Sequence, residues 1–466
     1  MEKIKKKIKM PHTFIIIILI IIIAVILTWI IPGGKYIRYA NAQGIRVIDP
    51  HKFEYIKNNP VNLLKIPMYI VKAFATNINL LLVIMFSGGA FHMLTKSEAL
   101  QTIIAKLAKK FSNHIGVFIS LLTLVFGLIC TTQAVNIFIA FAPVMVMLAL
   151  ALGLDSICGV AIILLGGAIG FSTGTLNVST TVISQKIADL PLYSGIGYRS
   201  VCFIVYFIVT NIFLVNYAKK IRKNPELSPM YDLDCQYKRK ENSNLEDFQE
   251  MGARKWVIIL LLILALTAIV YGCIMLGWDM QEQSAIFLIF GISVGIVAGF
   301  NANTICKEFL IGCKEMLGAM FIIGLARSIG DIMGDGDIID TVVYSLSKIL
   351  GIIPFYFQGV GMLISNMIIN VFITSGSGQA SVVMPIMIPL ADLIGMTRQT
   401  AILAFNFGDG FCNYVLPTST ALMGIIGATN IPYDRWMKFM WRCFILWIIT
   451  GAILILIAQI IKLGPM

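Results

Sequence analysis

FIIIILIIIIAVILTWII, the run from Phe14 to Ile31, contains no charged residue and decides the fold class. A helix needs about 20 predominantly apolar residues to cross the hydrocarbon core of a membrane. Runs of the same kind recur along the chain, among them Trp256 to Met275 and Phe444 to Ile461. The sequence therefore predicts an all-α, multi-pass membrane protein whose main surroundings are the lipid bilayer.

The composition of the 466 residues agrees, because 58% are hydrophobic and only 13% are charged, whereas soluble domains carry about 25% charged residues. The net charge of +12 comes from Lys and Arg that cluster beside apolar runs. Such clusters indicate membrane topology, so we expect no nucleic-acid partner. The nine Cys form no CxxC pair, and the four His show no zinc-binding spacing. We expect neither a resident metal nor a cofactor.

Charge also orients the chain, because Lys and Arg near membrane spans stay in the cytoplasm. This places the Lys-rich N-terminus and the polar segment Lys219 to Lys255 inside, and the acidic segment Asp331 to Asp340 outside. The run that starts at Phe14 is too long for a secretory signal, so we expect it to be retained. One exception is the basic stretch Lys35 to Lys57, which falls outside by the same count. Counting apolar segments predicts about nine transmembrane helices plus two re-entrant hairpins.

Two halves of the sequence resemble each other weakly but in order. Ala142-Pro-Val-Met matches Met384-Pro-Ile-Met, and Gly170-Phe matches Gly410-Phe further on. The crossing count gives the two halves opposite orientations, as in inverted-repeat transporters. We expect a first half over residues 1–217 with a hairpin near 115–150, a cytoplasmic loop over 218–255, and a second half over 256–466 with a hairpin near 353–394.

Small and polar residues interrupt four of the apolar segments. Non-helical backbone survives at membrane depth only where protein or a water-filled cavity satisfies it, and transporters bind solutes at such breaks. The predicted solute-binding residues at the two hairpin tips are Gln133, Asn136, Ser375, Gly376, Ser377, Gly378 and Gln379. Those at the two broken crossings are Ser172, Thr173, Asn177, Ser179, Asn406, Asp409, Asn413, Thr418 and Ser419. The alternative for the tips is close helix packing through small residues.

Asp409 is the most informative of these residues, because an ionisable side chain inside a membrane is costly and is a functional candidate by default. Between Ser377 and Pro417 the sequence holds one Lys or Arg, Arg398. An ionised Asp409 would attract an ammonium group, Na+ or H+. The alternative is a structural carboxylate paired with a cation of another helix, and Arg327 is the nearest candidate in the sequence.

Several motifs together resemble the YfcC family, a bacterial branch related to the DcuC anaerobic dicarboxylate carriers of the ion transporter superfamily. They are Lys9-Met-Pro-His-Thr, the stretch Gly324 to Thr341, Ser375-Gly-Ser-Gly-Gln-Ala, Thr397-Arg-Gln-Thr-Ala, and Phe407-Gly-Asp-Gly-Phe with Pro417-Thr-Ser. The similarity covers nearly the whole chain. It implies inverted repeats, two re-entrant hairpins and elevator-like movement. Cys130-Thr-Thr-Gln-Ala departs from the acidic tip of many relatives.

The sequence thus predicts a secondary transporter of a small charged organic solute in the cell membrane. The resemblance leaves two substrates open, basic amino acids exchanged as arginine for ornithine and C4-dicarboxylates, and Asp409 favours the basic amino acid. The coupling ion, Na+ or H+, and the formation of a homodimer also stay open. We expect no enzyme: an intramembrane serine hydrolase at Ser377 would lack a base, because the sequence has no His after His114. A passive channel fits paired hairpins less well than alternating access does.

Overall fold

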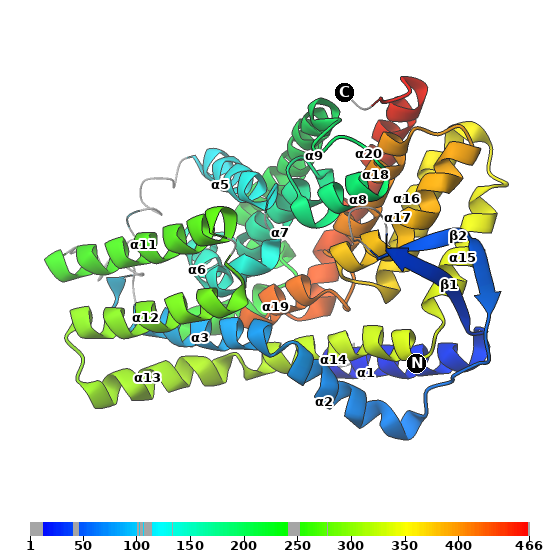
Figure 1. The fold of residues 1–466 in the computed structure, drawn as a ribbon. Helices are drawn as coiled ribbons and strands as arrows, with labels where there is room; N and C mark the ends of the chain where they lie inside the picture. The colour runs from blue at the N-terminus through cyan, green and yellow to red at the C-terminus, as the bar shows by residue number, and fades with distance from the viewer. Residues whose placement is uncertain are drawn as a thin grey trace, which may run out of the picture.

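The computed structural model describes residues 13–40, 46–99, 102, 106, 114–132, 134–240, 252–276 and 278–464. These residues are mostly helical, with one two-stranded sheet among them (Figure 1). Within them, six helices are long and apolar enough to cross a membrane, or seven if the bent pair Ala302–Glu315 and Met320–Asp335 is one span. The predicted class of helical membrane protein is confirmed. The count of nine crossings and the re-entry of the hairpins stay predictions.

One group of helices lies in the lower part and along the left-hand side of Figure 1 and forms what we call the base layer. They are α1 (Thr13–Ile30), α2 (Ile66–Thr76), α3 (Ile78–Lys96), α11 (Ala253–Met275), α12 (Met280–Ala298), α13 (Ala302–Glu315) and α14 (Leu317–Asp335), with the short η1 (Leu63–Lys65) before α2.

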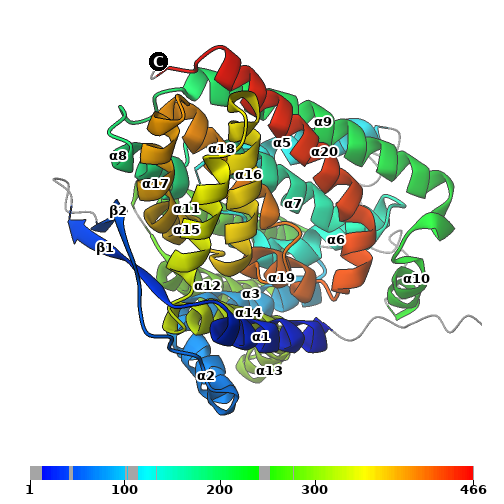
Figure 2. The same cartoon turned by 90° about the vertical axis from the view of Figure 1, so that its right-hand side faces the viewer.

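Above the base layer stands a second group of helices, which we call the hairpin unit (Figures 1 and 2). Its elements from the first half are α5 (Ile115–Cys130), η2 (Val135–Phe141), α6 (Ala142–Ala151), α7 (Ser156–Thr173), η3 (Val178–Val182), α8 (Ile183–Ile187) and α9 (Ile196–Lys223). Its elements from the second half are α16 (Phe355–Phe372), α17 (Gly376–Leu393), α18 (Arg398–Cys412), α19 (Thr420–Ala428) and α20 (Tyr433–Ile460). The remaining elements are β1 (Gly34–Ala40), β2 (Arg46–Tyr55), η4 (Pro225–Leu227), α10 (Tyr231–Lys240) and α15 (Ile339–Leu350).

The packing follows the same pattern in both halves. In the base layer, α3 packs on α12 and α13, and α14 packs on α1 and α2. In the hairpin unit, α5 packs on α7 as α16 packs on α18, and α9 packs on α7 as α20 packs on α18. This correspondence supports the division into two related halves, whose boundaries and relative orientation we propose from the sequence.

Helices α16 and α17 form a hairpin whose two arms run in opposite directions. Gln379 Nε2 of α17 donates a hydrogen bond to the Asn366 carbonyl of α16 at 3.0 Å. At the open end of the hairpin, Phe355 at the start of α16 lies 3.8 Å from where a Cβ on Gly395, just after α17, would stand. The tip is therefore the short segment between Phe372 and Gly376, and the polar residues Gly376 to Ser381 belong to the first turns of α17.

The sheet was not expected from the sequence, and it accounts for the basic stretch that breaks the charge rule. Strands β1 and β2 are antiparallel, with Gly34 opposite Tyr55. Lys35 Nζ lies 3.1 Å from Asp337, and Lys72 of α2 lies 3.9 Å from Asp335. The basic stretch thus begins beside the acidic stretch, so the two charges partly cancel at that surface.

Candidate functional site

A cavity of about 130 Å³ lies where three broken segments of the hairpin unit meet helix α14 of the base layer. Its walls come from the start of η2, the tip of the α16–α17 hairpin, the break after α18, and the start of α19. The lining residues are Ala134, Val135, Asn136, Phe171, Arg327, Thr374, Gly376, Asn413, Tyr414, Ser419, Thr420 and Ala421. Residues on either side of three interruptions in the sequence therefore converge on one space.

Two helices begin at this cavity, and each start is capped by a predicted site residue. Ser375 is the N-cap of α17, and its Oγ accepts a hydrogen bond from Gly378 N at 3.3 Å. Ser419 is the N-cap of α19, and its Oγ accepts from Leu422 N at 3.4 Å. The first turn of a helix presents free N–H groups and a partial positive charge. The cavity is thus polarised to receive an anionic group.

Arg327 of α14 adds a full positive charge to the same cavity. Its Nε is buried and has no hydrogen-bond partner, and no carboxylate of the described residues lies within 4.0 Å of its guanidinium. The fully buried Arg199 is different, because it donates to the Ser194 carbonyl at 2.6 Å and to Gln399 at 2.7 Å. Arg327 therefore lines the cavity with a guanidinium whose Nε has no protein partner, and a guanidinium is the side-chain group best suited to a carboxylate.

Asp409 does not line the cavity but lies sealed beside it, with 0% of its surface exposed. Its Oδ1 accepts a hydrogen bond from Asn370 Nδ2 at 2.7 Å, whereas its Oδ2 is buried without a partner. Among the described residues no cation pairs with it, so the alternative of an Asp409–Arg327 ion pair is not observed. Gly376 covers it, because a Cβ on Gly376 would stand 3.0 Å from Asp409 Oδ2.

The other predicted residues divide between the cavity, its surroundings and the helix caps. Asn136, Gly376, Asn413 and Ser419 line the cavity. Buried around it, but not lining it, are Ser172, Thr173, Asn177, Gln379, Asn406 and Thr418. Three others lie half-buried at the tip of the α16–α17 hairpin without lining the cavity, namely Ser375, Ser377 and Gly378. Ser179 is exposed on η3, and Gln133 lies outside the described residues.

Some of the buried residues hold the breaks in shape instead of facing a solute. Asn177 caps η3 by accepting from Thr180 N at 3.1 Å, and Gln379 joins the two arms of the second hairpin. Thr173 Oγ1 donates to the Ile169 carbonyl of its own helix at 2.8 Å. These bonds explain why polar residues cluster there without all of them reaching the cavity.

The sequence analysis did not predict most of the apolar and weakly polar residues that line the cavity. It considered Arg327 only as an ion-pair partner of Asp409. Phe171, Tyr414 and Ala421 carry no signal that separates them from core residues. Arg327, in contrast, is an arginine within an apolar helix, and the rule that singled out Asp409 applies to it equally. The rule allows such a residue to be either a functional group or part of an ion pair, and the first option would have predicted Arg327 in the cavity.

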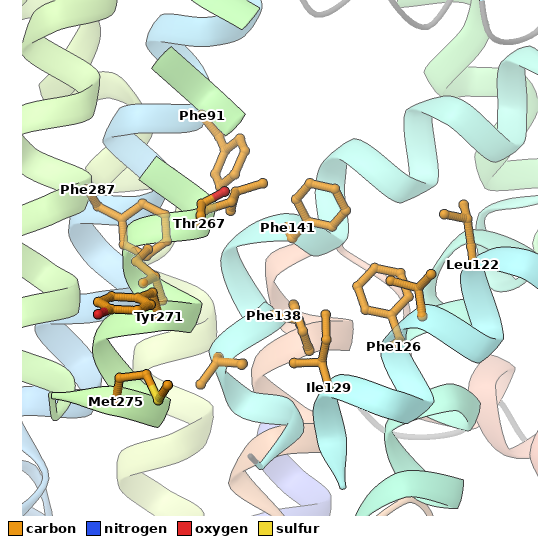
Figure 3. Close-up of a pocket in the computed structure, with 14 residues that line it drawn as sticks. Phe91, Leu122, Phe126, Ile129, Phe138, Phe141, Thr267, Tyr271, Met275 and Phe287 are labelled. Atoms are coloured by element: carbon orange, nitrogen blue, oxygen red, sulfur yellow. The ribbon is translucent and has the colours of Figure 1, made fainter. Parts of the chain in front are cut away.

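A second, mostly apolar cavity is less suited to a charged solute. It measures about 610 Å³ and lies between α5, η2, α11 and α12, where Phe126, Phe138, Phe141 and Phe287 point into it (Figure 3). The polar side chains in its lining are Thr267 and Tyr271. Burying a charge there without a partner would be costly, so we place the candidate site in the smaller cavity.

Comparison with known proteins matches the family model described as "DcuC: C4-dicarboxylate anaerobic carrier" to residues 10–460. A relative from Escherichia coli (strain K12), named "Putative basic amino acid antiporter YfcC", is 27% identical, and the alignment covers 97% of this chain and 96% of that one. An uncharacterized protein of Haemophilus influenzae is 25% identical, and the alignment covers 98% of each chain.

Two solved structures are similar over nearly the full length at low sequence identity. The Alcanivorax borkumensis YdaH transporter has a TM-score of 0.40 at 15% identity, with 98% of this chain and 100% of that chain covered. Neisseria gonorrhoeae MtrF, from a class of antimetabolite efflux pumps, has a TM-score of 0.42 at 15% identity, with 98% and 96% covered.

Proposed function

Because this chain belongs to the family of C4-dicarboxylate anaerobic carriers, we propose that it is a secondary transporter that binds a small carboxylate-bearing solute in the cavity beside Arg327. Its membership indicates a multi-pass membrane transporter and not an enzyme. The observation that carries the solute class is that Arg327, whose Nε has no hydrogen-bond partner, lines the same cavity as the starts of α17 and α19.

Within that class, the cavity fits a dicarboxylate better than a basic amino acid. Arg327 is the one charged residue among its described lining residues, and it is a cation. A pair of opposite charges about 4 Å apart gains about 4 kcal/mol at an effective dielectric constant near 20, before desolvation is subtracted. A second carboxylate can bind at the other helix start, whereas the side-chain cation of arginine or ornithine would meet positive partial charges.

The basic amino acid stays as a second candidate because of one specific observation. The unpartnered Oδ2 of Asp409 lies directly behind Gly376, which is a lining residue. If the α16–α17 tip moves outward during transport, Asp409 gains access to the cavity and offers an anion to an ammonium or guanidinium group. Exchange of arginine for ornithine would then use Arg327 for the α-carboxylate and Asp409 for the side chain.

Solute binding to the purified full-length protein tests this proposal. We expect calorimetry to detect either succinate or arginine, and Arg327→Gln to weaken that binding by at least about tenfold, because a charge-assisted bond is lost. Arg327→Lys should restore part of the affinity. Arg398→Gln is the control, since Arg398 lies outside the cavity, pairs with Asp392 at 2.8 Å and donates to the Ala188 carbonyl at 2.7 Å; an exposed ion pair contributes about 0–1 kcal/mol.

Each result of this assay has a definite meaning. Binding of succinate but not arginine supports the dicarboxylate, and the reverse supports the basic amino acid. Binding of either one with unchanged affinity in Arg327→Gln contradicts the site. Absence of binding for succinate, arginine and ornithine, in protein that is monodisperse, contradicts the proposed solute class.

A further inference from the structure

A third cavity, of about 690 Å³, lies between α9 and α20, and we call it the α9–α20 pocket. The two helices lie side by side (Figure 2) and run in opposite directions. Near the start of α9, Tyr198 Oη donates to the Leu454 carbonyl near the end of α20 at 2.6 Å. Near the other end, the ring centroids of Tyr217 and Phe439 are 4.6 Å apart. The last turns of α9 therefore lie beside the first turns of α20.

Cations from both helices line this pocket, namely Lys220 of α9 together with Lys438 and Arg442 of α20. Lys438 Nζ lies 3.5 Å from Asp434, which balances part of its charge. Lys220 and Arg442 are exposed, and among the described residues no carboxylate lies within 4.0 Å of either. The pocket therefore keeps an excess of positive charge that an anionic group can balance.

Apolar side chains line the remainder of the pocket and continue onto the membrane-facing surface. Ile212 lies two turns before Lys220 on α9, and Leu446 lies one turn after Arg442 on α20. At a rise of 1.5 Å per residue, Ile212 stands about 12 Å from Lys220 along the helix axis. Ile212 is 56% exposed and Leu446 is 40% exposed. Both belong to helices long and apolar enough to cross the membrane, so these side chains face lipid hydrocarbon.

Two exposed side chains indicate that the basic end of the pocket lies at the level of the lipid headgroups. Trp441, the residue before Arg442, is 52% exposed, and tryptophan is enriched at the interface between membrane and water. Leu227 of η4 is also 52% exposed and lines the pocket, although it belongs to the polar segment Lys219 to Lys255. An exposed leucine beside cations suits a ligand that carries both an anionic group and hydrocarbon.

We propose that the α9–α20 pocket binds an anionic membrane phospholipid, with its phosphate at Lys220 and Arg442 and an acyl chain along Ile212 and Leu446. Basic pockets between transmembrane helices bind anionic headgroups in this way. A zwitterionic lipid fits less well, because its ammonium group brings a further positive charge to the cations. Helix α9 of the first half packs on α7, and α20 of the second half packs on α18. The bound lipid therefore joins the two halves at this end.

Native mass spectrometry of the purified, delipidated full-length protein measures lipid binding, with dioleoyl phosphatidylglycerol or dioleoyl phosphatidylcholine added. We expect the first phosphatidylglycerol to bind at least about tenfold more tightly than phosphatidylcholine. The double variant Lys220→Gln/Arg442→Gln should lose this preference, because it removes the two cations that no described carboxylate balances. The matched control is Lys219→Gln/Arg222→Gln, which removes the same charge from exposed positions on α9 outside the pocket. This control should keep the preference of the wild type.

Three results would overturn the proposal. The first is equal affinity for phosphatidylglycerol in the wild type and the pocket variant, and the second is an equal loss in both double variants, which would mean that net charge alone attracts the lipid. The third is full displacement of the lipid by inorganic phosphate at constant ionic strength, which would identify a site for a free anion. Should the double variant fail to fold, Lys220→Gln and Arg442→Gln decide singly by the same criteria. Because no transported solute is added, the result is independent of the proposed function.

Discussion

At the scale of single residues, Gly376 controls how closely the hairpin tip approaches the buried carboxylate. It lines the solute cavity on one side and covers Asp409 Oδ2 on the other. Thr180 of the first half meets it at the same point. One missing side chain therefore lets the two halves of the protein meet between the solute cavity and the buried Asp409 carboxylate.

Replacing this glycine by alanine should impair transport more than the same change two residues later. In Gly376→Ala the new methyl group would stand 2.7 Å from Thr180 Cγ2, so the tip must move, and we expect at least about a tenfold loss of uptake. In Gly378→Ala the nearest atom is Ser375 Cβ at 3.2 Å, and uptake should stay within about twofold. Uptake in proteoliposomes, normalised to protein that is monodisperse, checks this. Equal effects of the two changes would mean that the contact at Gly376 does not matter.

The candidate site could be predicted from the sequence only in part, and the reasons are physical. The interruptions at Ser375 and Ser419 were visible because polar residues and glycine are costly within an apolar helix. Whether such a residue caps a helix or faces a solute depends on the course of the backbone around it. The spacing of polar residues in the sequence does not determine that course. The sequence also marked Asp409 as a charge inside the membrane, but it did not show that Gly376 closes it off while Arg327 stays accessible.

At the scale of elements, the start of α17 is the segment on which solute binding depends most. Ser375 accepts from Gly378 N and so fixes the first turn of α17, whose first residue, Gly376, lines the cavity. The same arrangement at α19 depends on Ser419. Both positions were predicted as solute-binding residues, and the structure gives each of them the role of a cap.

Removing the cap should therefore lower stability and weaken solute binding together. Ser375→Ala is expected to cost about 0.5–2 kcal/mol of stability, measured by thermal unfolding, and to lower the affinity for the solute. Ser375→Asn, which also caps helices well, should recover both. The matched control is Ser381→Ala on the same helix, whose hydroxyl donates to the Ser377 carbonyl at 2.8 Å. A loss of affinity in Ser375→Asn as large as in Ser375→Ala would contradict the capping role.

At the scale of the whole molecule, the prediction of two halves came from weak sequence matches, and the packing follows the same pattern. The weak matches fall in the hairpins and in the broken crossings, α7 and α18, where small residues are required. What the sequence did not provide is the contact between distant segments. The pairing of Lys35 with Asp337 joins residues far apart in the chain, so the sheet and its charge balance could not be read from local pattern.

The orientation of the chain in the membrane follows from the charge rule and can be measured in intact cells. Single cysteines at Glu226 and Asp335, both exposed, would be placed in a protein whose Cys235 and Cys306 are changed to Ser. An impermeant thiol reagent should label position 335 and leave position 226 unlabelled until the cells are opened, because basic segments stay in the cytoplasm. Labelling of position 226 alone would reverse the proposed topology.

The most direct test of the central claim is solute exchange across a sealed membrane. Proteoliposomes loaded with unlabelled succinate or arginine would be diluted into buffer with a trace of the same labelled solute, and uptake would be followed with time. The account predicts saturable uptake that is accelerated by solute inside, for one of the two solutes, and that is at least about tenfold slower in Arg327→Gln than in Arg398→Gln. Uptake that rises linearly with concentration without saturating, or that is equally fast in both variants, would contradict it.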